Sequence, residues 1–223
     1  MGNQNQLQWI ERNLDLVTPP VLEVGARHYN PGSAIDYRAA VGTTDYIGAD
    51  LSDGDNVDVV VDFTHNAVEV QRALGNRRFG TVICNSVLEH VDQPEIACAN
   101  ILSVVDPGAV LFVSVPFTWR HHGYPSDFWR FTEAGLQRLF PRVVWLRERS
   151  TISSTVDGDE QPIDSDINTF VVSDLRALDP RIKRWLPERV RRSVLPPRLR
   201  DHNYVLIPSL INLVGRVVGP SRP

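Results

Sequence analysis

The sequence predicts an α/β protein in which a mostly parallel sheet carries helices on both faces. Short apolar runs of strand length recur between residues 20 and 120. Segments with helical spacing separate these runs, and strands that alternate with helices in this way form parallel sheets. Two runs, Val21–Gly25 and Tyr46–Asp50, end in a glycine and an aspartate. Ligands of such sheets bind at the carboxyl ends of the strands, so these two ends are the first candidate site.

The N-terminal half supplies the clearest elements. Leu7–Val17 has apolar residues three and four positions apart, which predicts a helix that Pro19 and Pro20 bring to an end. Residues 26–42 form a loop that leads into a weak helix. The other elements expected here are the strands Val57–Phe63 and Phe79–Asn85 and, between them, the helix Asn66–Leu74.

The C-terminal half continues the alternation. Val87–Val105 is predicted to be a helix, interrupted near Asp92 and Pro94, and Thr132 is a suitable N-cap for a helix that ends at Phe140. The remaining expected strands are Ala109–Val115, Val143–Arg149 and Asn168–Ser173.

Charge is distributed unevenly along the 223 residues. The net charge of −4 combines −11 before Asp179 with +7 from that residue onward. An acidic body, and a basic tail with few aromatic residues, argue against nucleic acid as a partner. The two cysteines, Cys84 and Cys98, are too few for a disulfide framework and suit small buried side chains. No signal peptide or membrane-spanning run is evident, so we expect a cytoplasmic protein.

The tail differs from the body. We expect one domain over residues 1–178 and a basic, then helical or apolar, extension over residues 179–223. Its apolar stretch, Tyr204–Val218, needs burial. It could pack on the body, form an oligomer contact or touch a membrane surface. A homodimer is the expected assembly.

The first two strand ends have the chemistry of a nucleoside site. Gly25 permits a tight turn, but the dinucleotide pattern G-x-G-x-x-G is absent, and Glu23 favours a cationic ligand. Asp50 stands where a ribose-binding carboxylate is expected, since a carboxylate accepts hydrogen bonds from both hydroxyls of a diol. Asp62 and Phe63 suit a purine, with an acceptor for the exocyclic amine beside an aromatic ring.

With these features, the chain resembles the class I S-adenosylmethionine-dependent methyltransferases, in particular those called methyltransferase type 11. The matching blocks are V-L-E-V-G-A-R, Y-I-G-A-D, the pair D-F, F-G-T-V-I-C-N-S-V-L-E-H-V, V-V-D-P-G-A-V-L-F-V-S-V-P and H-G-Y-P-S-D-F-W-R-F-T. They run from about Val21 to Phe140. The resemblance implies a Rossmann-like, seven-stranded sheet and S-adenosylmethionine as cofactor. A near absence of lysine also suggests similarity to actinobacterial sugar or polysaccharide O-methyltransferases.

The resemblance also implies positions for the cofactor. Glu23, Gly25 and Ala26 are expected near the methionine part of the cofactor, and Asp50 at the ribose. Asp62 and Phe63 are expected to flank the adenine. Asn85 and Ser86, at the end of the fourth strand, are expected to lie over the cofactor. Arg27 and Leu51 are expected to line the same site. The chain departs from the family in having Ala26–Arg27 where a second glycine is usual.

Glu89 and His90 follow the fourth strand, from which catalytic groups of this fold reach the methyl group. In some similar O-methyltransferases an E-x-x-E-H pattern holds Mg²⁺, but the first glutamate position is Ser86 here. Two interpretations stay open: a metal site that uses Glu89 and His90, or a structural pair at a helix start.

The loop after the fifth strand, Arg120–Phe131, gathers histidines, aromatic residues, an aspartate and arginines. Aromatic faces and hydrogen-bonding side chains suit a sugar ring or an arene. His122, or His90, is the candidate general base, with Asp127 as its partner. The other expected acceptor contacts are His121, Tyr124, Trp129 and Arg130. The alternative interpretation is a structural lid.

Together these features predict methyl transfer from S-adenosylmethionine to a hydroxyl of a small polar acceptor, with a sugar or glycoside favoured. Two rival hypotheses remain: methylation of an aromatic or lipid-like acceptor near a membrane, and a nucleoside-binding protein without catalysis.

Overall fold

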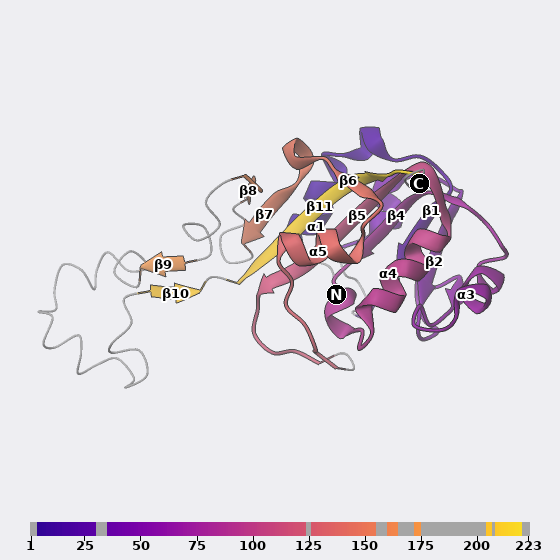
Figure 1. Ribbon diagram of the computed structural model, residues 1–223, viewed down its shortest axis with the longest axis horizontal. Helices are drawn as coiled ribbons and strands as arrows, with labels where there is room; N and C mark the ends of the chain where they lie inside the picture. Colours follow the sequence, from indigo (N-terminus) through magenta and orange to yellow (C-terminus); the bar gives the residue numbers. More distant parts are fainter. Residues whose placement is uncertain are drawn as a thin grey trace, which may run out of the picture.

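The computed structural model describes residues 4–29, 35–123, 126–154, 160–164, 172–174, 204–206 and 208–219. Among these residues a nine-stranded sheet forms the centre of the molecule (Figure 1). Helices pack against both of its faces. The predicted α/β class is therefore confirmed, with a central sheet that is mostly parallel.

The sheet has a defined strand order, and its first five strands pair in parallel. In spatial order the strands are β3 (Val59–Val60), β2 (Tyr46–Asp50), β1 (Val21–Val24), β4 (Phe79–Asn85), β5 (Val105–Thr118), β11 (Ser209–Val217), β7 (Thr151–Ser154) and β8 (Glu160–Pro162), while β6 (Val143–Trp145) pairs beside β11. Because the order reverses between β1 and β4, the carboxyl ends of these two strands border the crevice where ligands bind in such sheets.

Two apolar clusters separate the faces of the sheet. The helices α3 (Ala67–Ala73), α4 (Pro94–Ser103) and α5 (Glu133–Leu139) contribute to one cluster, and α1 (Gln4–Glu11) and α2 (Tyr37–Val41) contribute to the other. Side chains alternate along β1: Leu22 and Val24 enter the first cluster and Val21 the second. Glu23 therefore points to the α1–α2 face.

Side-chain caps fix where three of the helices begin. Asp36 accepts from the backbone N–H of Ala39 at 2.8 Å to start α2, and Asn66 accepts from Glu69 at 3.1 Å to start α3. Thr132 caps α5 through Gly135, also at 3.1 Å, as the sequence predicts. Among the described helices, none has both the length and the apolar character needed to cross a bilayer.

Several expected elements are shorter or divided. The predicted helix Leu7–Val17 is α1 followed by a 3₁₀ turn, η1 (Leu14–Leu16). The predicted helix Val87–Val105 is a second 3₁₀ turn, η2 (Leu88–His90), followed by α4, because Pro94 fits the first turn of a helix but not its interior. The strand expected at residues 57–63 is limited to β3.

The C-terminal part differs from the expectation. The predicted strand Val143–Arg149 ends at Trp145 and continues as η3 (Arg147–Arg149). In the segment predicted as the last strand, β9 (Val172–Asp174) pairs with β10 (Tyr204–Leu206) in a separate two-stranded sheet. Most of the apolar stretch Tyr204–Val218, expected in an appendage, is instead β11, which lies antiparallel between β5 and β7. The apolar side chains of β11 are buried within the body.

Candidate active site

A cavity of about 470 Å³ opens at the carboxyl ends of β1, β2 and β4. Residues at the carboxyl ends of β1 and β2 and just after β3 line one side of the cavity. Residues of η2 and of the loop after β5 line the other side. The lining includes nine residues predicted from the sequence: Gly25, Arg27, Asp50, Leu51, Asp62, Phe63, Ser86, His90 and His122. The fold thus brings together strand ends that are far apart in the sequence.

Gly25 lets the β1 turn approach the chain that leaves β4. Its φ is +76°, and a Cβ atom placed there would lie 2.3 Å from Cγ2 of Val87. Any other residue would strain the backbone and collide with this side chain. The glycine predicted at this turn is therefore required by close packing at the cavity wall.

Asp50 ends β2 and is 7% exposed. Its Oδ2 accepts from the backbone N–H of Arg27 at 3.2 Å, and its Oδ1 accepts from that of Ser52 at 3.1 Å. Each oxygen therefore keeps a lone pair that a ligand hydroxyl can use. Two turns thus hold this carboxylate at the cavity wall.

Asp62 and Phe63 lie beside Asp50 in the same wall. Oδ1 of Asp62 accepts from both the backbone N–H and the hydroxyl of Thr64, at 2.8 and 2.7 Å. Oδ2 lies 3.7 Å from Nε2 of His65. Oδ2 is thus the oxygen left for a ligand amine, beside the ring of Phe63.

Three residues expected at the cofactor, Glu23, Ala26 and Asn85, are buried and do not belong to the lining of this cavity. Strand alternation explains two of them, because Glu23 and Asn85 point to the α1–α2 face. Glu23 accepts from the hydroxyl of Tyr46 at 2.8 Å and from Nδ2 of Asn56 at 3.0 Å. Burial raises the pKa of Glu23 to about 7 despite these bonds.

Ser86 is the first residue after β4 and has a left-handed backbone, with φ of +54°. Its N–H donates to the carbonyl of Ser114 at 2.8 Å, and its hydroxyl accepts from Nε2 of Gln6 at 2.9 Å. Gln6 also donates to the hydroxyl of Ser114 at 2.8 Å. These bonds hold a strained turn against the cavity, where such backbone outliers often occur.

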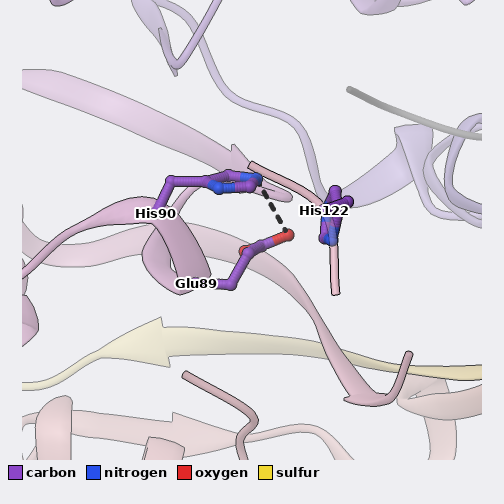
Figure 2. A group of neighbouring side chains, drawn as sticks. All are labelled: Glu89, His90 and His122. Atoms are coloured by element: carbon purple, nitrogen blue, oxygen red, sulfur yellow. Dashed lines mark ion pairs between the residues drawn. The ribbon is translucent and has the colours of Figure 1, made fainter. Parts of the chain in front are cut away.

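At the other end, Glu89, His90 and His122 form a cluster (Figure 2). Glu89 and His90 belong to η2, and His122 comes from the loop after β5. Oε1 of Glu89 lies 3.9 Å from Nε2 of His90, and the two imidazole rings stand edge to face with centroids 4.9 Å apart. Burial lowers the pKa of His90 and raises that of Glu89, since a buried site disfavours both charged forms.

Asp127 orients His122. Its Oδ2 accepts from the backbone N–H of His122 at 2.8 Å and lies 3.3 Å from Nδ1 of the same residue. Arg130 donates to both carboxylate oxygens, at 2.5 and 2.8 Å. This bidentate pair holds the pKa of Asp127 well below its usual range. The aspartate predicted as partner of a histidine base thus lies beside it.

The rest of the loop is fastened to η2. The backbone N–H groups of Phe128 and Trp129 donate to the carbonyl of Glu89 at 2.8 and 3.3 Å, and Nε1 of Trp129 donates to the carbonyl of Val91 at 2.8 Å. Trp129 and His121 are exposed, and neither lines the cavity. Arg130 acts on Asp127, and Tyr124 lies outside the described residues.

Several lining residues were not predicted. Tyr29, whose ring stacks under the guanidinium of Arg27, had no signal in the sequence. Phe128 and Ser126 lie in the loop that the sequence singles out, although neither is assigned a contact there. The carbonyl of Ser126 lies 2.5 Å from Nδ1 of His90, a contact between residues 36 positions apart that no local pattern could reveal.

Solved structures share the whole fold at low sequence identity. The YcgJ protein of Bacillus subtilis is 10% identical, with a TM-score of 0.54, over 98% of this chain and 100% of that chain. The 1,6-didemethyltoxoflavin-N1-methyltransferase of Burkholderia thailandensis, solved with 1,6-didemethyltoxoflavin and S-adenosylhomocysteine, is 13% identical, with a TM-score of 0.50, over 97% and 78%. A SAM-dependent methyltransferase of Archaeoglobus fulgidus is 12% identical, with a TM-score of 0.50, over 94% of each chain.

A family model extends the comparison to the sequence itself. No curated protein matches this chain. The model described as a methyltransferase domain matches residues 5–160, which cover α1 except its first residue, the strands β1 to β7 and every cavity residue described above. The match confirms the class of enzyme predicted from the sequence: the chain belongs to the methyltransferase domain family.

Proposed function

We propose that the protein transfers a methyl group from S-adenosylmethionine to a hydroxyl of a small polar acceptor, with a sugar or glycoside as the favoured class. One observation carries the proposal. A single cavity joins the nucleoside-type wall of Asp50, Asp62 and Phe63 to the histidines His90 and His122. Donor and acceptor chemistry therefore meet in one space.

The donor end suits the cofactor by its residue chemistry. Asp50 would accept the ribose hydroxyls, and Asp62 and Phe63 would flank the adenine, while Gly25, Arg27, Leu51 and Ser86 would line the remainder. When bound, S-adenosylmethionine supplies a methyl carbon on a positively charged sulfur. Glu23, Ala26 and Asn85 would support the cofactor walls from behind.

At the acceptor end, His122 would remove the proton. The carboxylate of Asp127 faces Nδ1 of His122, which favours a proton on that nitrogen and a lone pair on Nε2. The acceptor oxygen would form a bond to the methyl carbon as the carbon–sulfur bond breaks. The electron pair of the broken bond would stay on sulfur, and the proton of the acceptor hydroxyl would pass to Nε2 of His122. Alignment of the two reactants contributes on the order of 7–11 kcal/mol, and the base adds roughly 10²- to 10⁴-fold.

A second acceptor class has its own support. The wall near the histidines includes Val91 and Phe128, whose apolar side chains suit an aromatic acceptor better than a sugar. The N1-methyltransferase among the compared structures also makes nitrogen acceptors worth testing.

The test is incubation of the full chain with methyl-labelled S-adenosylmethionine and a matched panel of sugars, glycosides, phenols, carboxylic acids and amines. We expect label in a hydroxyl compound, and in sugars before phenols. Label confined to acids or amines would contradict hydroxyl transfer. Binding of S-adenosylhomocysteine without labelling of any acceptor would favour the nucleoside-binding alternative.

A further inference from the structure

The cluster of Glu89, His90 and His122 has a chemistry that proton transfer alone does not use. It offers one carboxylate oxygen and two imidazole nitrogens that all lie within 4.8 Å of one another. Figure 2 shows the carboxylate of Glu89 directed toward the space between the two rings. Two segments, η2 and the loop after β5, are held together so that these groups converge.

Both histidines are oriented by acceptors at Nδ1. For His90 the acceptor is the carbonyl of Ser126 at 2.5 Å, and for His122 it is the carbonyl of Arg120 at 3.3 Å, with Oδ2 of Asp127 also 3.3 Å from the same nitrogen. A proton shared with these acceptors sits on Nδ1 and leaves the lone pair of each Nε2 available. Histidines that bind metals are typically oriented in this way, by a carbonyl or carboxylate on the other ring nitrogen.

Glu89 supplies an independent reason for a cation. Its side chain is only 1% exposed, and its Oε2 has no hydrogen-bond partner among the described residues. A buried carboxylate oxygen without a partner costs free energy, and a bound cation offsets that cost. The cluster therefore combines two imidazole nitrogens with a buried carboxylate whose Oε1 faces His90 and whose Oε2 has no partner among the described residues.

We propose that Glu89, His90 and His122 hold a divalent transition-metal ion such as Zn²⁺ or Co²⁺ at the acceptor end of the cavity. Two imidazoles and one carboxylate are a common zinc set that leaves a fourth position open. Mg²⁺ prefers oxygen ligands and retains several waters, so this donor set fits it poorly. The expectation of Mg²⁺ from the E-x-x-E-H pattern is revised accordingly.

The inference deepens the proposed function and, in its catalytic part, rests on it. His90 and His122 line the cavity, so an open position between them faces the acceptor. With the metal ion bound, Nε2 of His122 would be a ligand rather than the proton acceptor, and a hydroxyl in the open position would lose its proton to water more readily. Metal binding itself needs neither cofactor nor acceptor and can be measured alone.

The experiment titrates the full chain, without an affinity tag and stripped of metal with EDTA, with ZnCl₂ in a calorimeter. We expect one equivalent to bind with a dissociation constant of about 1 µM or lower. Glu89→Gln, His90→Ala and His122→Ala should each weaken binding about tenfold or more. The matched control is His65→Ala, a surface histidine outside the cluster whose Nε2 lies 3.7 Å from Oδ2 of Asp62 and whose Nδ1 lies 3.5 Å from Oε2 of Glu69.

A second measurement uses only the wild-type chain and therefore does not depend on whether the variants fold. Co²⁺ added to the wild-type chain should give the visible absorption of a low-coordinate ion, which ZnCl₂ then abolishes. Equal zinc affinity in Glu89→Gln and wild type, loss of binding in His65→Ala, or Mg²⁺ bound more tightly than Zn²⁺ would overturn the proposal. Binding of S-adenosylhomocysteine is measured separately in the presence of EDTA. A chain that binds zinc but not S-adenosylhomocysteine would contradict the proposed function and leave the metal site standing.

Discussion

His122 and His121 are neighbours in the sequence with different surroundings. His122 lines the cavity and faces Asp127, whereas His121 is exposed and outside the cavity lining. A pair of adjacent histidines thus provides a test and its own matched control.

Replacing His122 by Asn should lower kcat by roughly 10²- to 10⁴-fold. The variant lacks the imidazole that would accept the proton of the acceptor hydroxyl or would hold the metal ion. Formation of S-adenosylhomocysteine, with the acceptor identified in the panel, measures this effect. His121→Asn should keep nearly full activity. A loss below tenfold in His122→Asn, or equal losses in both variants, contradicts the assigned role.

Glu23 makes the stability of the fold depend on pH. Its pKa rises from 4.5 to about 7 because the side chain is buried on the α1–α2 face. Between these values the folded chain keeps a proton that the unfolded chain releases. The free energy of unfolding therefore falls as pH increases through this window, by up to roughly 3 kcal/mol.

Glu23→Gln removes that dependence while an oxygen remains for Tyr46 and Asn56. Relative to wild type, the free energy of unfolding of the variant should rise by roughly 3 kcal/mol between pH 4.5 and a pH above 7. Urea unfolding at four pH values measures the difference. Glu11→Gln, on the exposed end of α1, should show no such trend. A pH-independent difference for Glu23→Gln would show that the carboxyl is not the source.

At the scale of elements, β11 is joined to its neighbours by side chains as well as by its backbone. Asn212 is fully buried, accepts from the hydroxyl of Ser114 at 2.6 Å, and donates to those of Thr151 and Ser153, both at 3.1 Å. One amide therefore connects β5, β11 and β7. Polar groups in such a network are costly to leave unpaired.

Asn212→Ala should lower the free energy of unfolding by about 1–3 kcal/mol, because the buried hydroxyls of Ser114 and Ser153 and the half-buried hydroxyl of Thr151 each lose a partner. Chemical denaturation measures the change. Arg216→Ala, on the same strand with an exposed side chain, should cost much less. Similar losses in both variants would show that the network adds nothing beyond the strand itself.

The elements that the sequence predicts well are those with local signals. Apolar runs ending in Gly25 and Asp50 gave β1 and β2 nearly to the residue, and the cap at Thr132 placed the start of α5. The strand β11 was not predicted, because Ser209–Val217 returns to pair with β5, whose partner positions lie 91 to 106 residues earlier. No local pattern distinguishes such a strand from an apolar appendage.

The site divides in the same way. Asp50, Asp62 and Phe63 follow strands and were recognisable from their positions. The family resemblance places Glu23 and Asn85 beside the cofactor, whereas alternation along each strand turns their side chains to the α1–α2 face. The approach of His122 to His90 depends on the loop that bonds to Glu89, which is a tertiary contact.

At the scale of the molecule, the body and the C-terminal strand form one sheet. The predicted division after residue 178 therefore separates β11 from β5 and β7, which flank it. A chain that ends at residue 178 should lose cooperative thermal unfolding, because β5 and β7 expose apolar faces and unpaired edges. Circular dichroism on heating measures this, with a chain that lacks only residues 220–223 as control. A cooperative transition in the shorter chain would establish residues 1–178 as an independent domain.

We infer that S-adenosylmethionine binds in the cavity at the ends of β1 and β2 and that Asp50 holds it there. Calorimetric titration with S-adenosylhomocysteine tests this claim on the wild type, on Asp50→Asn and on the exposed control Asp53→Asn. We predict one equivalent bound by the wild type and by Asp53→Asn, and binding about tenfold or more weaker in Asp50→Asn, because a charged acceptor of the ribose hydroxyls is lost. No binding to the wild type, or equal binding by Asp50→Asn, would contradict the claim.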